Sequence, residues 1–298
     1  MSVAIRPMFF GMIGLVVVLS GCDPTESEAE PGQVSESAAC PSDAEIDRFL
    51  ADWHEAQPAQ AVAAGGTFED AFCAQQKLLD RLIPTLGNPV GFKAGLTSQA
   101  AQETFGVTEP VRGVLLEGML LDDGAEIPVD FGARPRFEAD IIVVVSDNAI
   151  NDATTIEEVL ANLSEVVPFI EVPDLAVSED EPLDGVILTA VNVAARLGVV
   201  GDPIPVQQTP EFLQALADMT VRLVDGSGEE LVSTPGSAIL GHPLNSVLWL
   251  MESGLQLSPG DQLSLGSFGP LLIPEAGQSA TLHYEGLPGN PTASVSFY

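Results

Sequence analysis

Two carboxylates stand close together in the segment 134–145, at the point where an apolar, β-branched run begins. Glu138 and Asp140 are two positions apart, and residues with this spacing on a strand point to the same face. Two anions that share a partly buried site repel each other unless a cation neutralises them. Carboxylate oxygens suit a hard divalent ion, Mg²⁺ or Mn²⁺. The pair therefore indicates a metal site; the alternative is that the strand has barely begun and both side chains lie in water.

The elements that must position this pair fall into two parts. Residues 43–57 and 67–84 carry apolar side chains at helical spacing and predict an N-terminal helical subdomain, residues 43–90. From Gly91 the pattern changes to short apolar runs broken by Gly, Pro and Asp, with few helices inserted. We expect strands at 111–116, 126–129, 141–145, 169–172, 186–191, 199–200, 262–267, 279–284 and 293–298, and helices at 154–163, 210–223 and 244–252. This mixture predicts a β-rich α+β domain over residues 91–298.

The first 42 residues have a different composition from the rest. Arg6 precedes an apolar run, residues 9–19, that is short for a membrane span and typical of a signal peptide, residues 1–21. The run ends in Leu19-Ser-Gly-Cys22, which resembles a bacterial lipobox, with lipidation expected on Cys22; the alternative is an ordinary signal peptide with a chance cysteine. Residues 22–42 are acidic and small, and predict a disordered tether. We therefore expect a protein of the cell envelope, lipid-anchored on the periplasmic side of a bacterial membrane.

The net charge limits the possible partners of the protein, and two of its cysteines could form a disulfide. The formal net charge is −33, from 43 acidic and 10 basic side chains, which excludes nucleic acid as a partner and leaves the lipid anchor as the means of membrane attachment. Outside the cytoplasm Cys40 and Cys73 can form a disulfide, although Cys73 alone also fits a small buried residue.

Eight motifs in order carry a resemblance to a known family. They are Thr67–Gln75, Gly91–Ser98, Gly106–Pro110, Asp123–Pro128, Arg136–Ile141, Pro168–Val172, Leu240–Pro243 and Leu265–Ser267. Residues 43–298 resemble the 2-keto-4-pentenoate hydratase and 4-oxalocrotonate decarboxylase group of the fumarylacetoacetate hydrolase superfamily. The resemblance implies mixed β-sheets rolled into a barrel-like core, and generally a homo-oligomer.

The resemblance also implies a site. Glu138, Asp140 and Glu171 match the family's metal carboxylates, with Asp140 in place of a second Glu, so the cofactor is expected to be Mg²⁺ or Mn²⁺. Lys93 matches an active-site lysine that orients the substrate carboxylate or transfers a proton. Thr97, Ser98 and Ser267 are expected to line the pocket as hydroxyl donors. His242 is expected to be a structural turn residue.

The implied chemistry is that of a hydro-lyase. A small 2-oxo acid chelates the ion, which stabilises an enolate while water adds across a double bond; decarboxylation or C–C cleavage uses the same enolate. Two family residues are missing, because Ala176 stands where an Arg is usual and Val191 where an Asp is usual. The alternative function is therefore a catalytically lapsed envelope lipoprotein that binds a small carboxylate or a metal ion.

Overall fold

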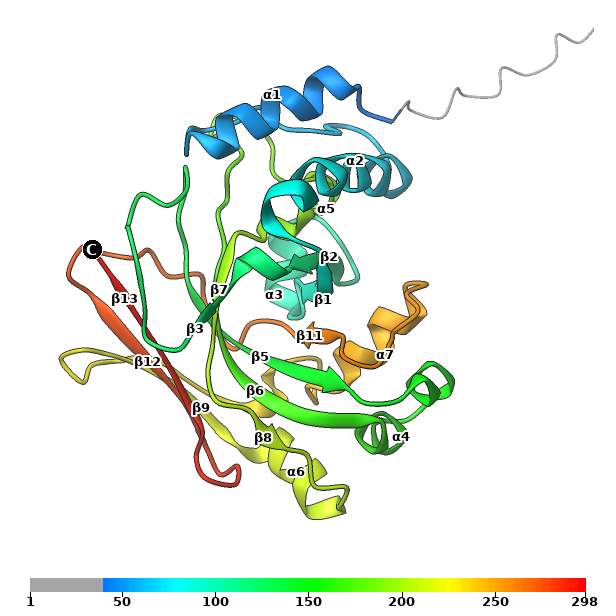
Figure 1. The fold of residues 1–298 in the computed structure, drawn as a ribbon, viewed down its shortest axis with the longest axis vertical. Coiled ribbons are helices and arrows are strands. Elements are labelled where there is room, and N and C mark those ends of the chain that lie inside the picture. The colour runs from blue at the N-terminus through cyan, green and yellow to red at the C-terminus, as the bar shows by residue number, and fades with distance from the viewer. Residues whose placement is uncertain (1–39) are drawn as a thin grey trace, which may run out of the picture. The chain divides into compact units, whose positions relative to one another are not determined.

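The computed structural model describes residues 40–298, and these form an α+β fold built on two β-sheets (Figure 1). The fold class expected from the sequence is confirmed. The predicted signal peptide, Cys22 and residues 22–39 of the predicted tether lie outside the described residues. Within residues 40–298, no helix combines the length and the apolar character needed to cross a membrane.

The larger sheet has eight strands and holds the predicted site. Its strands follow the order β2-β1-β11-β5-β6-β7-β3, with β8 paired to β6. The strand bounds are β1 Pro89–Gly95, β2 Val111–Leu116, β3 Leu120–Asp122, β5 Glu138–Val145, β6 Leu163–Val172, β7 Leu197–Val200, β8 Ile204–Pro205 and β11 Gln262–Ser264. The pairs β1–β11 and β3–β7 are parallel and the others are antiparallel, so the sheet is mixed.

The smaller sheet has five strands and packs against the larger one. Its order is β10-β9-β12-β13-β4, with bounds β4 Ala125–Ile127, β9 Thr220–Asp225, β10 Glu230–Pro235, β12 Ser279–Glu285 and β13 Thr292–Phe297. Phe137, just before β5, and Phe297 of β13 are both buried, with ring centroids 5.1 Å apart. The apolar faces of the two sheets thus share the main hydrophobic core, which also takes in α6 and α7.

Seven α-helices and four short 3₁₀ turns complete residues 40–298. They are α1 Asp43–His54, α2 Phe68–Leu86, α3 Gln99–Thr104, α4 Ile156–Ala161, α5 Gly185–Ala190, α6 Pro210–Asp218, α7 Asn245–Glu252, η1 Glu117–Met119, η2 Asn148–Asp152, η3 Asn192–Ala194 and η4 Gly236–Ala238. Ser42, Thr67 and Thr155 each form a capping box with an acidic residue three positions later, which satisfies free backbone N–H groups and fixes where α1, α2 and α4 begin.

A second hydrophobic core lies between the N-terminal helices and α5. Ile46, Phe49 and Leu50 of α1 are buried there, and Ile187 of α5 packs in the same cluster. A disulfide joins Cys40, just before α1, to Cys73 of α2, with the two Cα atoms 5.7 Å apart.

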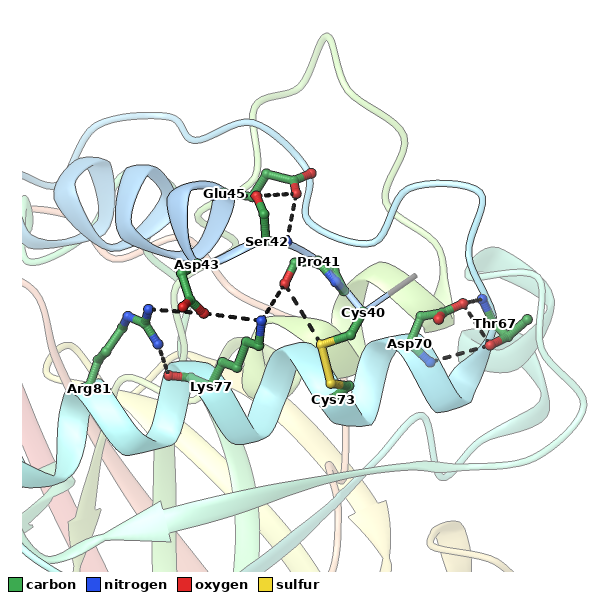
Figure 2. The surroundings of a disulfide bond; sticks show 10 residues. All are labelled: Cys40, Pro41, Ser42, Asp43, Glu45, Thr67, Asp70, Cys73, Lys77 and Arg81. Atoms are coloured by element: carbon green, nitrogen blue, oxygen red, sulfur yellow. Dashed lines mark hydrogen bonds and ion pairs between the residues drawn. A yellow bond between two sulfur atoms is a disulfide. The ribbon is translucent and has the colours of Figure 1, made fainter. Parts of the chain in front are cut away.

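Ion pairs surround this disulfide. Figure 2 shows Lys77 and Arg81 of α2 directed at Asp43, with N–O distances of 3.1 and 3.4 Å. The Asp43 side chain is 70% exposed, so we expect these pairs to contribute little to stability and the disulfide to be the main local constraint.

Two of the expected elements are wrong. The run 186–191, predicted as a strand, is helix α5, because Asp184 caps its first turn by accepting the Ile187 N–H, and the whole run is largely buried. The sequence predicts one helix over residues 210–223, but α6 ends at Asp218 and β9 begins at Thr220. Apolar runs that are buried on all sides carry no periodicity that separates a helix from a strand.

Candidate active site

A cavity of about 570 Å³ opens above the middle of the eight-stranded sheet. Its lining comes from β1 and the turn after it, from α3, from the adjoining ends of β5 and β6, from α5 and η3, and from the loop after β11. Six of the predicted site residues line it, namely Lys93, Thr97, Ser98, Glu138, Glu171 and Ser267. Lys93 and Ser267 are 174 positions apart in the sequence, so only the fold brings these residues together.

Glu138 and Glu171 form the acidic part of the cavity. They are directly paired in the antiparallel ladder of β5 and β6, so their side chains lie next to each other on one face. Burial is the main cause that raises the pKa of Glu138 well above its usual value, and the negative charge of Glu171 raises it further, while Lys93 lowers it. Keeping both carboxylates ionised therefore requires positive charge at this position.

Asp140 lies behind these two side chains and does not line the cavity. It is completely buried, and its carboxylate accepts hydrogen bonds from the Ser264 hydroxyl at 2.6 Å and from the Gly266 N–H at 3.1 Å. Burial, followed by the charge of Glu171, raises the pKa of Asp140 to about 7, and the bond from Ser264 opposes the shift. Asp140 therefore adds a third acidic group just beneath the pair.

Lys93 is the cation of the site. It is 3% exposed, and its ammonium group donates to Glu171 and, at 2.9 Å, to the Val193 carbonyl. Its charge lowers the pKa of both Glu138 and Asp140. Lys93 is therefore a buried, ion-paired residue of β1 and not a solvated surface lysine.

The carbonyl that holds Lys93 belongs to an unusual turn. Asn192, Val193 and Ala194 have φ values of 58°, 52° and 56°, a left-handed conformation that costs side-chain-bearing residues about 1–2 kcal/mol each. The Asn192 amide clamps the turn to β2, because it accepts from the Val114 N–H at 2.8 Å and donates to the Val114 carbonyl at 2.9 Å. We conclude that contacts to β2 maintain the conformation that directs the Val193 carbonyl at Lys93.

The three predicted hydroxyl donors differ in how they are engaged. Ser98 caps α3, its oxygen accepting from the Ala101 N–H at 3.3 Å. Ser267 donates to the Gly269 carbonyl at 2.8 Å, and the nearby hydroxyl also lowers the pKa of Glu138. Thr97 is 4% exposed and lies against Gly266, where a Cβ would meet the Thr97 hydroxyl at 2.2 Å.

Within residues 40–298, no three His, Cys, Asp or Glu side chains are close enough together to hold a metal ion in the present arrangement. The reason is local, since Glu171 turns toward Lys93 and Asp140 toward Ser264. The charges nevertheless do not balance: three buried or partly buried carboxylates share the single ammonium group that the pKa shifts reflect. Oxygen ligands with excess negative charge are the donor set of a hard divalent cation.

The two positions at which the usual Arg and Asp of the family are replaced lie outside the cavity. Ala176 and Val191 are buried in the second core with the N-terminal helices, so they do not fill the pocket. His242 is also structural: one ring nitrogen lies 3.0 Å from the Leu213 carbonyl, and the other accepts from the Leu244 N–H. Burial lowers its pKa.

Three residues that support the site are not predicted from the sequence. Ser264 and Gly266 hold Asp140, and the fully buried Tyr284 of β12 donates its hydroxyl to the Asp140 carbonyl. A Ser between Leu263 and Leu265 and a Tyr hydroxyl in β12 are the available signals, because a buried hydroxyl needs a partner. Their partner could not be identified without the fold.

Known proteins of similar sequence identify the family of this chain. No family model matches the chain. It is 31% identical over 265 residues to the 2-keto-4-pentenoate hydratase of Paraburkholderia phymatum, and the match covers 85% of this chain and 98% of that protein. The chain belongs to the 2-keto-4-pentenoate hydratase family. A 4-oxalocrotonate decarboxylase of Pseudomonas putida is 28% identical over 229 residues, which cover 74% of this chain and 83% of the relative.

Solved structures agree on the fold of this family member. The 4-oxalocrotonate decarboxylase from Pseudomonas putida G7, complexed with magnesium and adipate, superposes with a TM-score of 0.74. The match covers 86% of this chain and 97% of that chain at 24% sequence identity. At this identity the likeness shows the fold alone, which is the fumarylacetoacetate-hydrolase-like fold expected from the sequence.

Proposed function

We propose that this protein is a metal-dependent lyase that acts on a small 2-oxo acid, by hydration of a 2-oxo-4-enoate or by a related decarboxylation or C–C cleavage. The observation that carries the proposal is the buried Lys93 beside the paired carboxylates Glu138 and Glu171 in the lining of a 570 Å³ cavity. Relatives of 30–31% identity that are named 2-keto-4-pentenoate hydratase support it. So does the 28% identical relative named 4-oxalocrotonate decarboxylase.

The cofactor of the proposal is a divalent cation, Mg²⁺ or Mn²⁺. Glu138, Glu171 and Asp140 would hold it, which matches the excess of negative charge at this point. A bound ion supplies Lewis acidity, drawing electron density from the carboxylate and keto oxygens of a 2-oxo acid. The magnesium in the related decarboxylase structure supports this choice.

The protein's own residues would bind, orient and protect the substrate. Lys93 would neutralise the substrate carboxylate or hold a proton at Nζ, since its bond to the Val193 carbonyl keeps it in place when Glu171 turns away. Thr97 and Ser267 would donate hydroxyl hydrogen bonds. The apolar remainder of the cavity would exclude bulk water and strengthen these interactions. In the hydration, the hydroxyl and a proton of one water molecule add to the two carbons of the double bond.

The experiment is a hydration assay with the full chain, 2-hydroxypenta-2,4-dienoate and Mg²⁺ or Mn²⁺, following loss of the conjugated absorbance. We expect turnover that chelation of the metal abolishes, and a decrease of at least about 100-fold for Lys93→Met. Lys77→Met is the matched control, because Lys77 lies on α2, does not line the cavity and pairs with the exposed Asp43. Metal-independent turnover, or full activity in Lys93→Met, would contradict the proposal.

We also propose that the protein is anchored by lipid at Cys22 to the periplasmic side of a bacterial envelope membrane. The segment Leu19-Ser-Gly-Cys22 supports this, and so does the Cys40–Cys73 disulfide, because disulfides persist in oxidising compartments. Metabolic labelling with a palmitate analogue should mark the wild type and not Cys22→Ser. Labelling of the variant would refute the anchor.

A homo-oligomer completes the proposal and rests on the family resemblance. Light scattering of the purified protein tests it, and a monomer at micromolar concentration would refute it.

A further inference from the structure

The charged side chains that line the active-site cavity form one cluster. Lys93, Glu138 and Glu171 are the three charged side chains among the residues that line it. They are contributed by the sheet, and Lys93 contacts Glu171 directly. A 2-oxo acid head group that binds the proposed metal and Lys93 would use all of this charge.

The rest of the lining is mostly apolar, and its uncharged polar side chains are the hydroxyl groups of Thr97, Ser98, Thr104 and Ser267. Leu96, Ala101, Phe105, Leu175, Leu188 and Leu271 form its apolar part, and among residues 40–298 no Lys, Arg or His other than Lys93 lines the cavity. A second carboxylate placed among these side chains would be buried without a cation or a set of N–H donors, which is strongly unfavourable. An alkyl group there would instead gain about fourfold in affinity for each methylene that it buries.

The size of the cavity is the second observation. Its 570 Å³ is well within the range of drug-sized ligand pockets, and a five-carbon 2-oxo acid would fill less than half of it. The unfilled part must therefore hold water against apolar walls or be occupied by a longer substrate. A longer substrate that ends in a hydrocarbon matches the walls.

From the charge distribution and the volume together, we infer that the substrate is a 2-oxo monocarboxylic acid extended by an apolar alkyl or aryl group, and not a dicarboxylic acid. The inference rests on the proposed function, because it names the substrate class of the same site. It assigns the apolar wall formed by α3, Leu175, Leu188 and Leu271 as the specificity-determining surface. It also favours hydration of an apolar enoate over chemistry on 4-oxalocrotonate-like diacids.

The test compares 2-oxooctanoate with 2-oxooctanedioate, two unreactive acids of equal length that differ in a terminal methyl or carboxylate. Calorimetric titration of the full chain in the presence of Mg²⁺ should give at least about 30-fold tighter binding of the monocarboxylate. Equal or tighter binding of the diacid would overturn the inference, and so would the absence of binding by either acid.

Variants of Ala101 supply the matched comparison. This residue is half-buried on α3 and lines the cavity, and both Arg and Leu are good helix formers. Ala101→Arg should reduce the preference for the monocarboxylate at least tenfold by giving the diacid a cation, while Ala101→Leu should keep it. An unchanged preference in Ala101→Arg would count against this wall as the specificity surface.

Failure of the proposed function would be distinguishable from failure of the inference. If no 2-oxo-4-enoate is hydrated but 2-oxooctanoate still binds preferentially, the lyase proposal is wrong and the assigned ligand class stands. If a diacid enoate is hydrated with a kcat/KM equal to that of its alkyl counterpart, the lyase proposal stands and the inference is wrong.

Discussion

Removal of the Cys40–Cys73 disulfide should destabilise the protein by an amount that follows from the chain topology. The bridge closes a loop with a sequence separation of 33. In the chain-entropy treatment, a loop of that length restricts the unfolded chain by about 12 cal/mol/K, or about 4 kcal/mol at 25 °C. The exposed ion pairs of Asp43 with Lys77 and Arg81 contribute little beside this.

The perturbation is Cys73→Ser, and the assay is equilibrium urea unfolding followed by tryptophan fluorescence. Trp53 lies on α1, the helix that the disulfide ties to α2, and therefore reports on this region. With an m-value of about 2–3 kcal/mol/M, a loss of 4 kcal/mol should lower the midpoint by about 1.5 M. Wild-type protein treated with a reductant should unfold at the same urea concentration as the variant.

A loss below about 1 kcal/mol would refute the reasoning. It would mean that the unfolded chain is already compact between residues 40 and 73, or that the second core holds α1 in place without the bridge. Cys40→Ser provides the internal check, because both variants open the same loop and should lose the same free energy of unfolding.

Three further perturbations test the support of the site. Tyr284→Phe removes the hydroxyl that donates to the Asp140 carbonyl and should lower the free energy of unfolding by about 1–2 kcal/mol in urea titrations; no loss would contradict that bond. Asn192→Ala should lower kcat by at least about tenfold and reduce the thermal midpoint, because the left-handed turn that presents the Val193 carbonyl loses its hydrogen bonds to β2. A variant with wild-type kcat would show that these hydrogen bonds are dispensable. Metal-free protein should gain stability as the pH falls from 8 to 6: the raised pKa of Asp140, about 7 in the fold, means that the folded state binds a proton that the unfolded state has released. The gain should be smaller in Asp140→Asn, and an equal gain in both proteins would assign the effect to other groups.

Local signals in the sequence predicted part of this structure well. The N-cap of α2 at Thr67 and the bounds of β2, Val111–Leu116, agree with the pattern because capping and short apolar runs act over a few residues. The strand assignment of 186–191 failed, because the side chain of Asp184 and burial on all sides decided its conformation. These influences are not contained in the β-branched composition of the run.

The candidate site shows the same division between local and non-local causes. The spacing of Glu138 and Asp140 on one strand suggested two inward-facing acids, and both are on β5. The sequence could not indicate that Ser264 would draw the Asp140 carboxylate away from the cavity, or that a turn 100 residues away would supply a carbonyl to Lys93. Such contacts depend on strand order, which brings β11 between β1 and β5.

The central claim is that Glu138, Asp140 and Glu171 hold a divalent metal ion that takes a chelating 2-oxo acid. Its most direct test is titration of the purified protein with Mg²⁺ and Mn²⁺, with and without oxalate as an enolate mimic. Wild type should bind oxalate only when metal is present, and Glu138→Gln should lose this binding. Glu165→Gln, at the opposite end of β6, is the matched control and should bind as wild type does. Absence of metal binding at millimolar concentration in the wild type would contradict the account.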